Sequence, residues 1–204
     1  KDKIFVAYNL RFHPLIQMLE DNLVNEEIIS INAYVGQYLP SWRKNRNYEK
    51  VYSSIKEKGG GVLRDLSHEL DYIIKIAGDW KKVTAIGGKF SELKIDSDDT
   101  FSILAVLKNC NVCSININYL DKLTRRNVII NTKKNTFELD FINGLFKKND
   151  LTEKVSIDGN YTYKKMHEEI IKKSFKNVCT FNEGISVLKM IESSEQSCIN
   201  NSVK

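Results

Sequence analysis

The 204-residue sequence is poor in the residues that mark special protein classes, with two prolines, three histidines and four cysteines. Four cysteines are too sparse for the disulfide framework of a small secreted protein, so we expect reduced thiols and a cytoplasmic location. The sequence also lacks an apolar run long enough to span a bilayer and lacks a signal-peptide pattern. We therefore expect no membrane partner.

Strong charge is absent as well, because the net charge is only +5. The aromatic residues occupy apolar-periodic positions instead of a basic face, so we expect no nucleic-acid partner. Cys110 and Cys113 form one C-x-x-C pair, but no second pair or nearby histidine pair completes a zinc site. We predict two reduced thiols in a hairpin, and no metal.

The hydrophobic pattern predicts an α+β fold. Short β-rich runs cover 3–8 and 26–39, a helical pattern covers the segment after Pro14, and two helical patterns close the chain. Between them, period-two alternation predicts consecutive strands joined by short turns, at 81–90, 100–107, 112–120, 126–131 and 136–141. Such an arrangement favours an open, mainly antiparallel sheet with helices packed on one face.

The stretch 59–72, GGGVLRDLSHELDY, joins three glycines to a helical pattern that should end at Ala77. A regular helix places Asp65, His68 and Tyr72 within one arc, opposite an apolar face. A histidine beside a carboxylate is typical of a general acid/base. The residues alone are also compatible with an exposed histidine on a helix whose acidic residues stabilise its first turn.

The segment 41–58 has six basic and two acidic residues and no periodicity. A long polar loop that carries aromatic residues is often functional, although a solvated surface loop has the same composition. We interpret it as a site for an anionic sugar, in which arginines meet phosphate or carboxylate and aromatic rings stack on the ligand. The candidate substrate-binding residues are Trp42, Arg43, Arg46, Tyr48 and Tyr52, together with Tyr72 of the following helix.

Four segments carry a resemblance to a known family: YNLRFHPLI (8–16), VGQYLPSW (35–42), the glycine-led stretch at 59–72, and DDTFSILAVL (98–107). From about residue 4 to 193, the sequence resembles the C-terminal part of the Gfo/Idh/MocA oxidoreductases. The resemblance implies a two-domain enzyme. Its N-terminal Rossmann domain would bind NAD or NADP, and its C-terminal domain would bind a sugar-type substrate and form a homo-oligomer through the sheet.

The resemblance also assigns roles to individual residues. His68 matches the acid/base of the family, and Asp65 matches its carboxylate neighbour, although two residues separate them here where many members have three. Asn9 and Arg11 match the segment that enters the cleft, where Arg11 would contact substrate or cofactor phosphate or else pair with a carboxylate. Gly60 and Gly61 would let the backbone approach the cofactor.

No G-x-G-x-x-G motif follows a strand, and no Glu-Lys-Pro segment supplies the catalytic lysine of the family. We therefore expect residues 1–193 to form the substrate-binding and oligomerisation domain, with 1–12 as the trailing strand of a Rossmann domain that the chain lacks. Residues 194–204 should form a polar tail. Alone, the chain should bind no cofactor and be inactive. The alternative is a non-catalytic binding or assembly module derived from such a domain.

Overall fold

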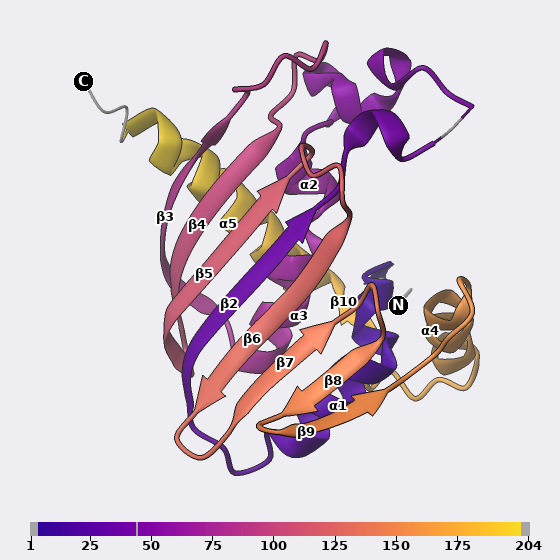
Figure 1. Ribbon diagram of the computed structural model, residues 1–204, viewed down its shortest axis with the longest axis vertical. Coiled ribbons are helices and arrows are strands. Elements are labelled where there is room, and N and C mark those ends of the chain that lie inside the picture. The colour runs from indigo at the N-terminus through magenta and orange to yellow at the C-terminus, as the bar shows by residue number, and fades with distance from the viewer. Residues whose placement is uncertain (1–3, 44, 201–204) are drawn as a thin grey trace.

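The computed structural model describes residues 4–43 and 45–200, and it confirms the α+β fold class (Figure 1). The α-helices are α1 Pro14–Asn22, α2 Val62–Asp65, α3 His68–Ala77, α4 Tyr161–Ile171 and α5 Phe181–Asn200. The strands are β1 Phe5–Val6, β2 Ile28–Gly36, β3 Trp80–Gly88, β4 Thr100–Leu107, β5 Cys110–Asn118, β6 Arg125–Thr132, β7 Thr136–Asp140, β8 Leu145–Lys148, β9 Leu151–Lys154 and β10 Cys179–Thr180. Short 3₁₀ helices are η1 Asn9–Phe12, η2 Leu39–Ser41, η3 Tyr48–Lys50, η4 Tyr52–Ser54 and η5 Lys56–Lys58.

Eight strands form one sheet in the order β3-β4-β5-β2-β6-β7-β8-β9. Only β2 and β5 run parallel, and every other neighbouring pair is antiparallel, as the sequence predicted. The predicted first strand is short and lies apart from this sheet, because β1 pairs with β10. Strands β8 and β9 were missed: β9 is exposed at all four positions, so its sequence carries no alternation to detect.

The alternation of β5 fixes which face of the sheet is covered. Cys113, Ile115 and Ile117 are at most 1% exposed and point toward the helices, whereas Ser114 and Asn116 point away. Helices α1, α3 and α5 lie behind this face in Figure 1, with the hydrophobic core between the two layers. The sheet therefore presents its other face outward.

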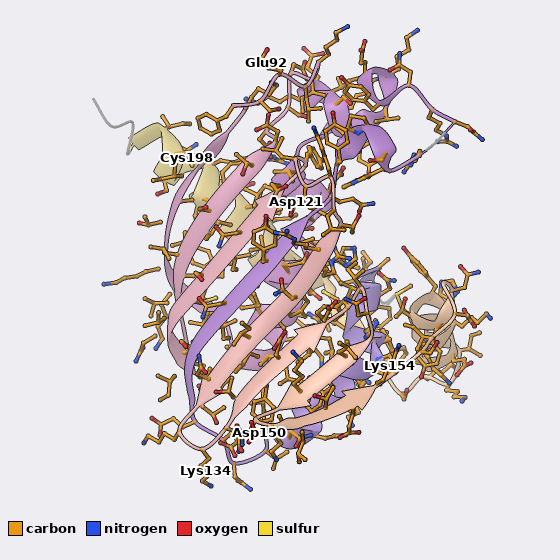
Figure 2. All side chains as sticks on the ribbon, viewed as in Figure 1. Glu92, Asp121, Lys134, Asp150, Lys154 and Cys198 are labelled. Carbon is orange, nitrogen blue, oxygen red and sulfur yellow. The ribbon has the colours of Figure 1, made fainter. Side chains whose placement is uncertain are left out.

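That outward face, which we call the open face, is covered by none of the described helices (Figure 2). Its centre carries hydrogen-bonded polar side chains, in which Ser102 donates to Asn116 and Ser114 donates to Asn32. Toward β3 it becomes apolar, and the exposed fractions of Ile86, Leu104 and Val112 are 67%, 60% and 60%.

Two local expectations were wrong. Helix α5 continues to Asn200, beyond the predicted start of a polar tail at 194, because Ser194 is fully buried and donates back to the Met190 carbonyl. Residues 1–3 and 201–204 of the predicted terminal segments lie outside the described residues. Cys110 and Cys113 both lie within β5 and do not flank a turn. Both are buried free thiols, and burial raises the pKa of Cys113 to about 12.

A candidate substrate-binding site at one end of the sheet

The chain does not pass through residues 59–77 as one regular helix. Helix α2 ends at Asp65, Leu66 adopts φ −105° and ψ 25°, and α3 restarts at His68. The predicted arc of Asp65, His68 and Tyr72 assumed 100° for every residue and was wrong for this reason. The apolar face was predicted correctly, since Val62, Leu66, Leu70, Ile73 and Ala77 are all buried.

Asp65 is joined to a tyrosine and not to His68. Its Oδ2 atom accepts a hydrogen bond of 2.7 Å from the hydroxyl of Tyr119, which is fully buried at the end of the β5 stripe. Burial and the neighbouring carboxylate raise the pKa of Tyr119, so its hydroxyl stays protonated and donating. The edge of Trp42 packs on Tyr119, with ring centroids 5.2 Å apart. Asp65 therefore links the α2–α3 junction to the segment 41–58.

His68 opens α3 beside the N-terminal segment. Its ring meets the ring of Tyr8 edge-on, with centroids 5.3 Å apart, and the Tyr8 hydroxyl shares a hydrogen bond with Ser67. The Nδ1 atom of His68 is buried and has no hydrogen-bond partner among the described residues. Burial and then the positive charge of Arg126 lower the pKa of His68 to about 4. The imidazole is therefore neutral at pH 7 and able to accept a proton.

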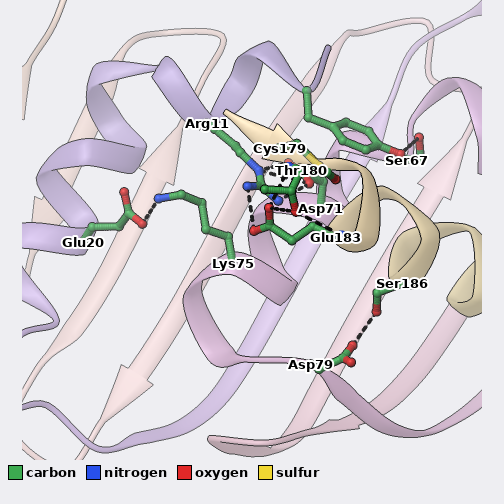
Figure 3. Close-up of polar contacts among 11 residues, drawn as sticks. Arg11, Glu20, Ser67, Asp71, Lys75, Asp79, Cys179, Thr180, Glu183 and Ser186 are labelled. Carbon is green, nitrogen blue, oxygen red and sulfur yellow. Dashed lines mark hydrogen bonds and ion pairs between the residues drawn. The ribbon is translucent and has the colours of Figure 1, made fainter. Parts of the chain in front are cut away.

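Arg11 is a buried structural anchor (Figure 3). Its guanidinium donates to both carboxylate oxygens of Asp71 over 2.7–3.1 Å and to Glu183 over 2.9 Å. Arg11 and Asp71 are 2% and 1% exposed. Burial opposes the charge of Arg11, but the Asp71 hydrogen bonds and charge outweigh it and raise its pKa. Of the roles that the resemblance left open for Arg11, the geometry supports pairing with a carboxylate.

Two further candidates are enclosed by the chain itself. Asn9 is 7% exposed and donates to the Thr162 hydroxyl over 2.7 Å. Tyr72 is 0% exposed, and its ring packs 5.8 Å from that of Phe141. Neither side chain presents a surface that a substrate could reach in this conformation, so the geometry opposes their assignment as direct substrate contacts.

The glycines are required by packing within the chain. A Cβ on Gly60 would clash with the Tyr52 carbonyl oxygen, and Gly61 combines a φ of 128° with an equally close approach to Asp98. Asp98 also occupies the helix start, because its backbone carbonyl accepts from Val62 N–H and its carboxylate accepts from Leu63 N–H. The predicted cofactor contact at Gly60 and Gly61 is therefore not supported, since these groups face the chain itself.

A nicotinamide dinucleotide needs a phosphate cradle such as a free helix start after a parallel strand. The described residues of this chain do not fit that requirement. Among the described helices, only α2 is directly preceded by consecutive glycines, and Asp98 already accepts hydrogen bonds from the N–H groups at its N-terminus. No group of three or more His, Cys, Asp or Glu among the described residues is placed to hold a metal ion. None of the described helices is long and apolar enough to cross a membrane.

The segment 41–58 folds into short 3₁₀ turns at the same end of the sheet. Trp42, Arg43, Arg46 and Tyr48 line one pocket, together with Leu39, Pro40, Val51 and Ser53. Both arginines also line an adjoining pocket with Tyr52, whose pKa is raised by partial burial and by Asp65. The structure thus brings five of the predicted substrate-binding residues together, next to Asp65.

Sequence reasoning missed three residues of this region: Tyr119, Glu69 and Arg126. Two of them had a signal, because Glu69 is a carboxylate on the buried side of α3 and Arg126 occupies an inward position of β6, in register with buried Val35. Nε of Arg126 lies 2.9 Å from Oε1 of Glu69, which is fully buried. A charged residue in the inward phase of a strand indicates either a buried ion pair or a site.

The comparisons with known proteins agree with this architecture. Residues 22–138, more than half of the chain, match the family described as the GFO/IDH/MocA C-terminal domain. The chain belongs to this oxidoreductase family and corresponds to its C-terminal domain. No curated protein matches the sequence.

Solved structures share the fold at low identity. UDP-N-acetylglucosamine 3-dehydrogenase GnnA from Acidithiobacillus ferrooxidans is 17% identical with a TM-score of 0.76, over 96% of this chain and 61% of that one. An oxidoreductase from Agrobacterium radiobacter, in complex with NAD+, L-tartaric acid and magnesium, is 16% identical with a TM-score of 0.78, over 97% and 63%. The WlbA dehydrogenase from Bordetella pertussis, in complex with NADH and UDP-GlcNAcA, is 16% identical with a TM-score of 0.76, over 97% and 61%. The chain spans less than two thirds of the length of each.

Proposed function

We propose that the chain is the substrate-binding domain of a nicotinamide-dependent oxidoreductase that acts on an anionic, nucleotide-linked sugar. Support comes from family membership, and from the ligands named in the structures of GnnA and WlbA, which act on or bind UDP-linked sugars. NAD or NADP would be held by residues outside this chain and would supply the hydride chemistry of the family. Alone, the chain would be inactive.

One observation carries the catalytic part of the proposal: His68 is a half-buried, neutral imidazole at the start of α3, three residues after Asp65, which accepts from Tyr119 beside Trp42. Nδ1 of His68 is buried, so the exposed part of the ring lies on its other side. There it can take the proton of a substrate hydroxyl during oxidation, or return one to a ketone oxygen during reduction. Tyr8 fixes the ring edge-on, and the Tyr8–Ser67 hydrogen bond fixes Tyr8.

The adjoining, more open pocket that Arg43, Arg46 and Tyr52 line would bind the anionic end of the substrate. Arg43 and Arg46 are exposed at its rim, and a guanidinium binds phosphate through paired N–H donors. Trp42 adds a buried indole N–H that has no partner among the described residues. Neutralising Arg43 and Arg46 together should raise the Michaelis constant by about tenfold or more, which corresponds to losing one charge-assisted hydrogen bond. Unchanged kinetics with the authentic substrate would remove this role.

The test of the catalytic assignment is steady-state turnover of a UDP-linked sugar by the full-length protein, with His68→Ala compared with His167→Ala. His167 is an exposed histidine on α4 and serves as the matched control. Loss of a general acid/base should lower kcat about 10²- to 10⁴-fold, and the control should keep the parent value. Equal activity of the two variants would refute the role of His68 and favour the non-catalytic binding module.

We also propose that a second copy of the chain covers the open face. Ile86, Leu104 and Val112 form an apolar group at its β3 side that an isolated chain leaves in water. Light scattering on the full-length protein should report a homo-oligomer that Leu104→Asp dissociates. A monomeric parent protein would refute this assembly, but it would leave the proposed acid/base role of His68 unaffected.

A further inference from the structure

Buried polar atoms gather around the first half of α3. Among the described residues, His68 Nδ1 and Tyr72 OH have no hydrogen-bond partner, whereas Glu69 Oε1 and Arg126 Nε form an ion pair over 2.9 Å without an aligned hydrogen bond. A buried polar atom left unpaired costs roughly 1–3 kcal/mol, so native proteins rarely keep several in one place unless a ligand or water completes them. This cluster is separate from the pocket of segment 41–58 and is not explained by it.

Arg126 is the member of the cluster that a ligand can reach. Nε lies 2.9 Å from Glu69 Oε1 without an aligned hydrogen bond, and Nη2 donates to Glu69 Oε2 over a long 3.4 Å. Glu69 is 0% exposed, whereas the Arg126 side chain is 23% exposed. One edge of the guanidinium therefore faces a buried carboxylate, while part of the Arg126 side chain stays exposed to solvent, and its charge acts on His68, the residue before Glu69.

The local field favours an anion. Burial and then the charge of Arg126 lower the pKa of both His13 and His68 to about 4. The two rings lie on different segments, and the positive field of Arg126 reaches both despite its pairing with Glu69. Both histidines are neutral at pH 7, so Arg126 and not a histidine supplies the positive charge that an anion would meet here.

We propose that Arg126 is a specificity-determining residue that binds a carboxylate of the substrate beside His68, so that the sugar itself is an acid. This inference rests on the proposed function and narrows its substrate to a nucleotide-linked uronic acid. Glu69 orients the guanidinium from below, and the substrate carboxylate takes the free donors from the cleft side. The segment 41–58 would hold the diphosphate, and Arg126 would hold the sugar end.

Binding of the substrate carboxylate to Arg126 would also make His68 a stronger base. The charged or titratable groups that face His68 are Tyr8 from the N-terminal segment and Arg126 from β6, and Glu69 follows it in α3. A carboxylate on Arg126 offsets the cation that disfavours imidazolium, so it raises the pKa of His68 in the complex. A neutral sugar would leave the base weaker.

The experiment measures the affinities of UDP-glucuronic acid and UDP-glucose by titration calorimetry on the full-length protein. These probes differ only in a carboxylate and a hydroxymethyl group. The parent should prefer the acid by roughly 10- to 100-fold, the range expected for a charge-assisted hydrogen-bond pair. Arg126→Gln should abolish the preference, and Arg126→Lys should restore part of it. Arg125→Gln is the matched control, because Arg125 is exposed and points to the open face.

A second readout tests whether the charge of Arg126 acts on His68. The acidic limb of kcat/KM against pH reports the free enzyme, and Arg126→Gln should move it upward from about 4 by only part of the distance to 6.5, because the cation is removed while the larger effect, burial of His68, remains. Equal weakening of both ligands by Arg126→Gln, or a parent that prefers the neutral sugar, would overturn the inference. If the folded parent bound neither nucleotide sugar, the proposed function would fail as well.

Discussion

The buried pair of Arg11 and Asp71 allows a sharp test of how the N-terminal segment is held. Asp71→Ala removes an acceptor that takes three guanidinium contacts of 2.7, 2.9 and 3.1 Å and leaves Arg11 buried with Glu183 alone. Removing one partner of a buried ion pair costs about 3–5 kcal/mol, and the remaining Glu183 contact places the expected loss near ~3 kcal/mol. Against a typical stability of about 5–15 kcal/mol, this is a large change.

The assay is urea unfolding of the 204-residue chain, followed by the fluorescence of Trp42 and Trp80, its two tryptophans. With an m-value of roughly 2 kcal/mol/M, the midpoint should fall by about 1.5 M. Glu27→Ala is the control, because Glu27 pairs with Lys133 at the surface, where both side chains are more than 60% exposed. Its midpoint should move by less than about 0.5 M.

Because the loss of stability comes from leaving the Arg11 charge buried without Asp71, a second variant should restore it. Replacing both partners by apolar residues of similar size, Arg11→Met with Asp71→Leu, should recover much of the stability that Asp71→Ala loses. If Asp71→Ala shifts the midpoint no more than Glu27→Ala does, or if the double variant is no better than the single one, the pair is not the anchor that the geometry suggests.

Two further predictions concern the same region. His13 has a folded pKa of about 4 against about 6.5 when unfolded, so the unfolded chain gains a proton as pH falls, and stability should decline between pH 6.5 and 4 by up to ~1.4 kcal/mol per pH unit. His13→Asn keeps an N-cap acceptor for α1 and should flatten that decline in urea midpoints measured at pH 7 and pH 5; an unchanged slope would contradict the assignment. Gly61→Ala should lower the urea midpoint by more than Gly59→Ala, because both have positive φ but only Gly61 would also clash, with Asp98; equal losses would show that backbone conformation alone matters.

Side-chain periodicity predicted the centre of the sheet because burial there is one-sided. The inward stripe of β5, from Cys113 through Ile115 and Ile117, alternates with polar residues, and that alternation is visible without coordinates. Strands β8 and β9 lie at the sheet edge. In β9 every residue is exposed, so the strand is held by backbone pairing and not by apolar burial. Its sequence therefore shows no alternation of apolar and polar residues from which a strand could be predicted.

The candidate site was predictable residue by residue only where local rules hold. Composition and resemblance proposed His68 and the aromatic and basic residues of segment 41–58 as candidates, but they did not identify the partner of Asp65. A two-residue break at Leu66 and Ser67 redirected Asp65 toward Tyr119, which lies 54 positions away in the sequence. A helical wheel cannot show such a break, because it assumes the regularity that fails here.

The buried side-chain atoms that lack hydrogen-bond partners point to the proposed site independently of any sequence motif. Elsewhere in the described part of the chain, buried and half-buried charges are paired: Arg11 with Asp71, and Lys75 with Glu20. Of the six buried side-chain atoms without a hydrogen-bond partner among the described residues, five belong to segment 41–58, to α3 or to the Arg126 that faces α3. The unpaired atoms of Trp42, His68 and Tyr72 support our proposal of a polar ligand in this region, and the ion pair of Arg126 with Glu69 near the neutral His68 supports our proposal that this ligand is acidic.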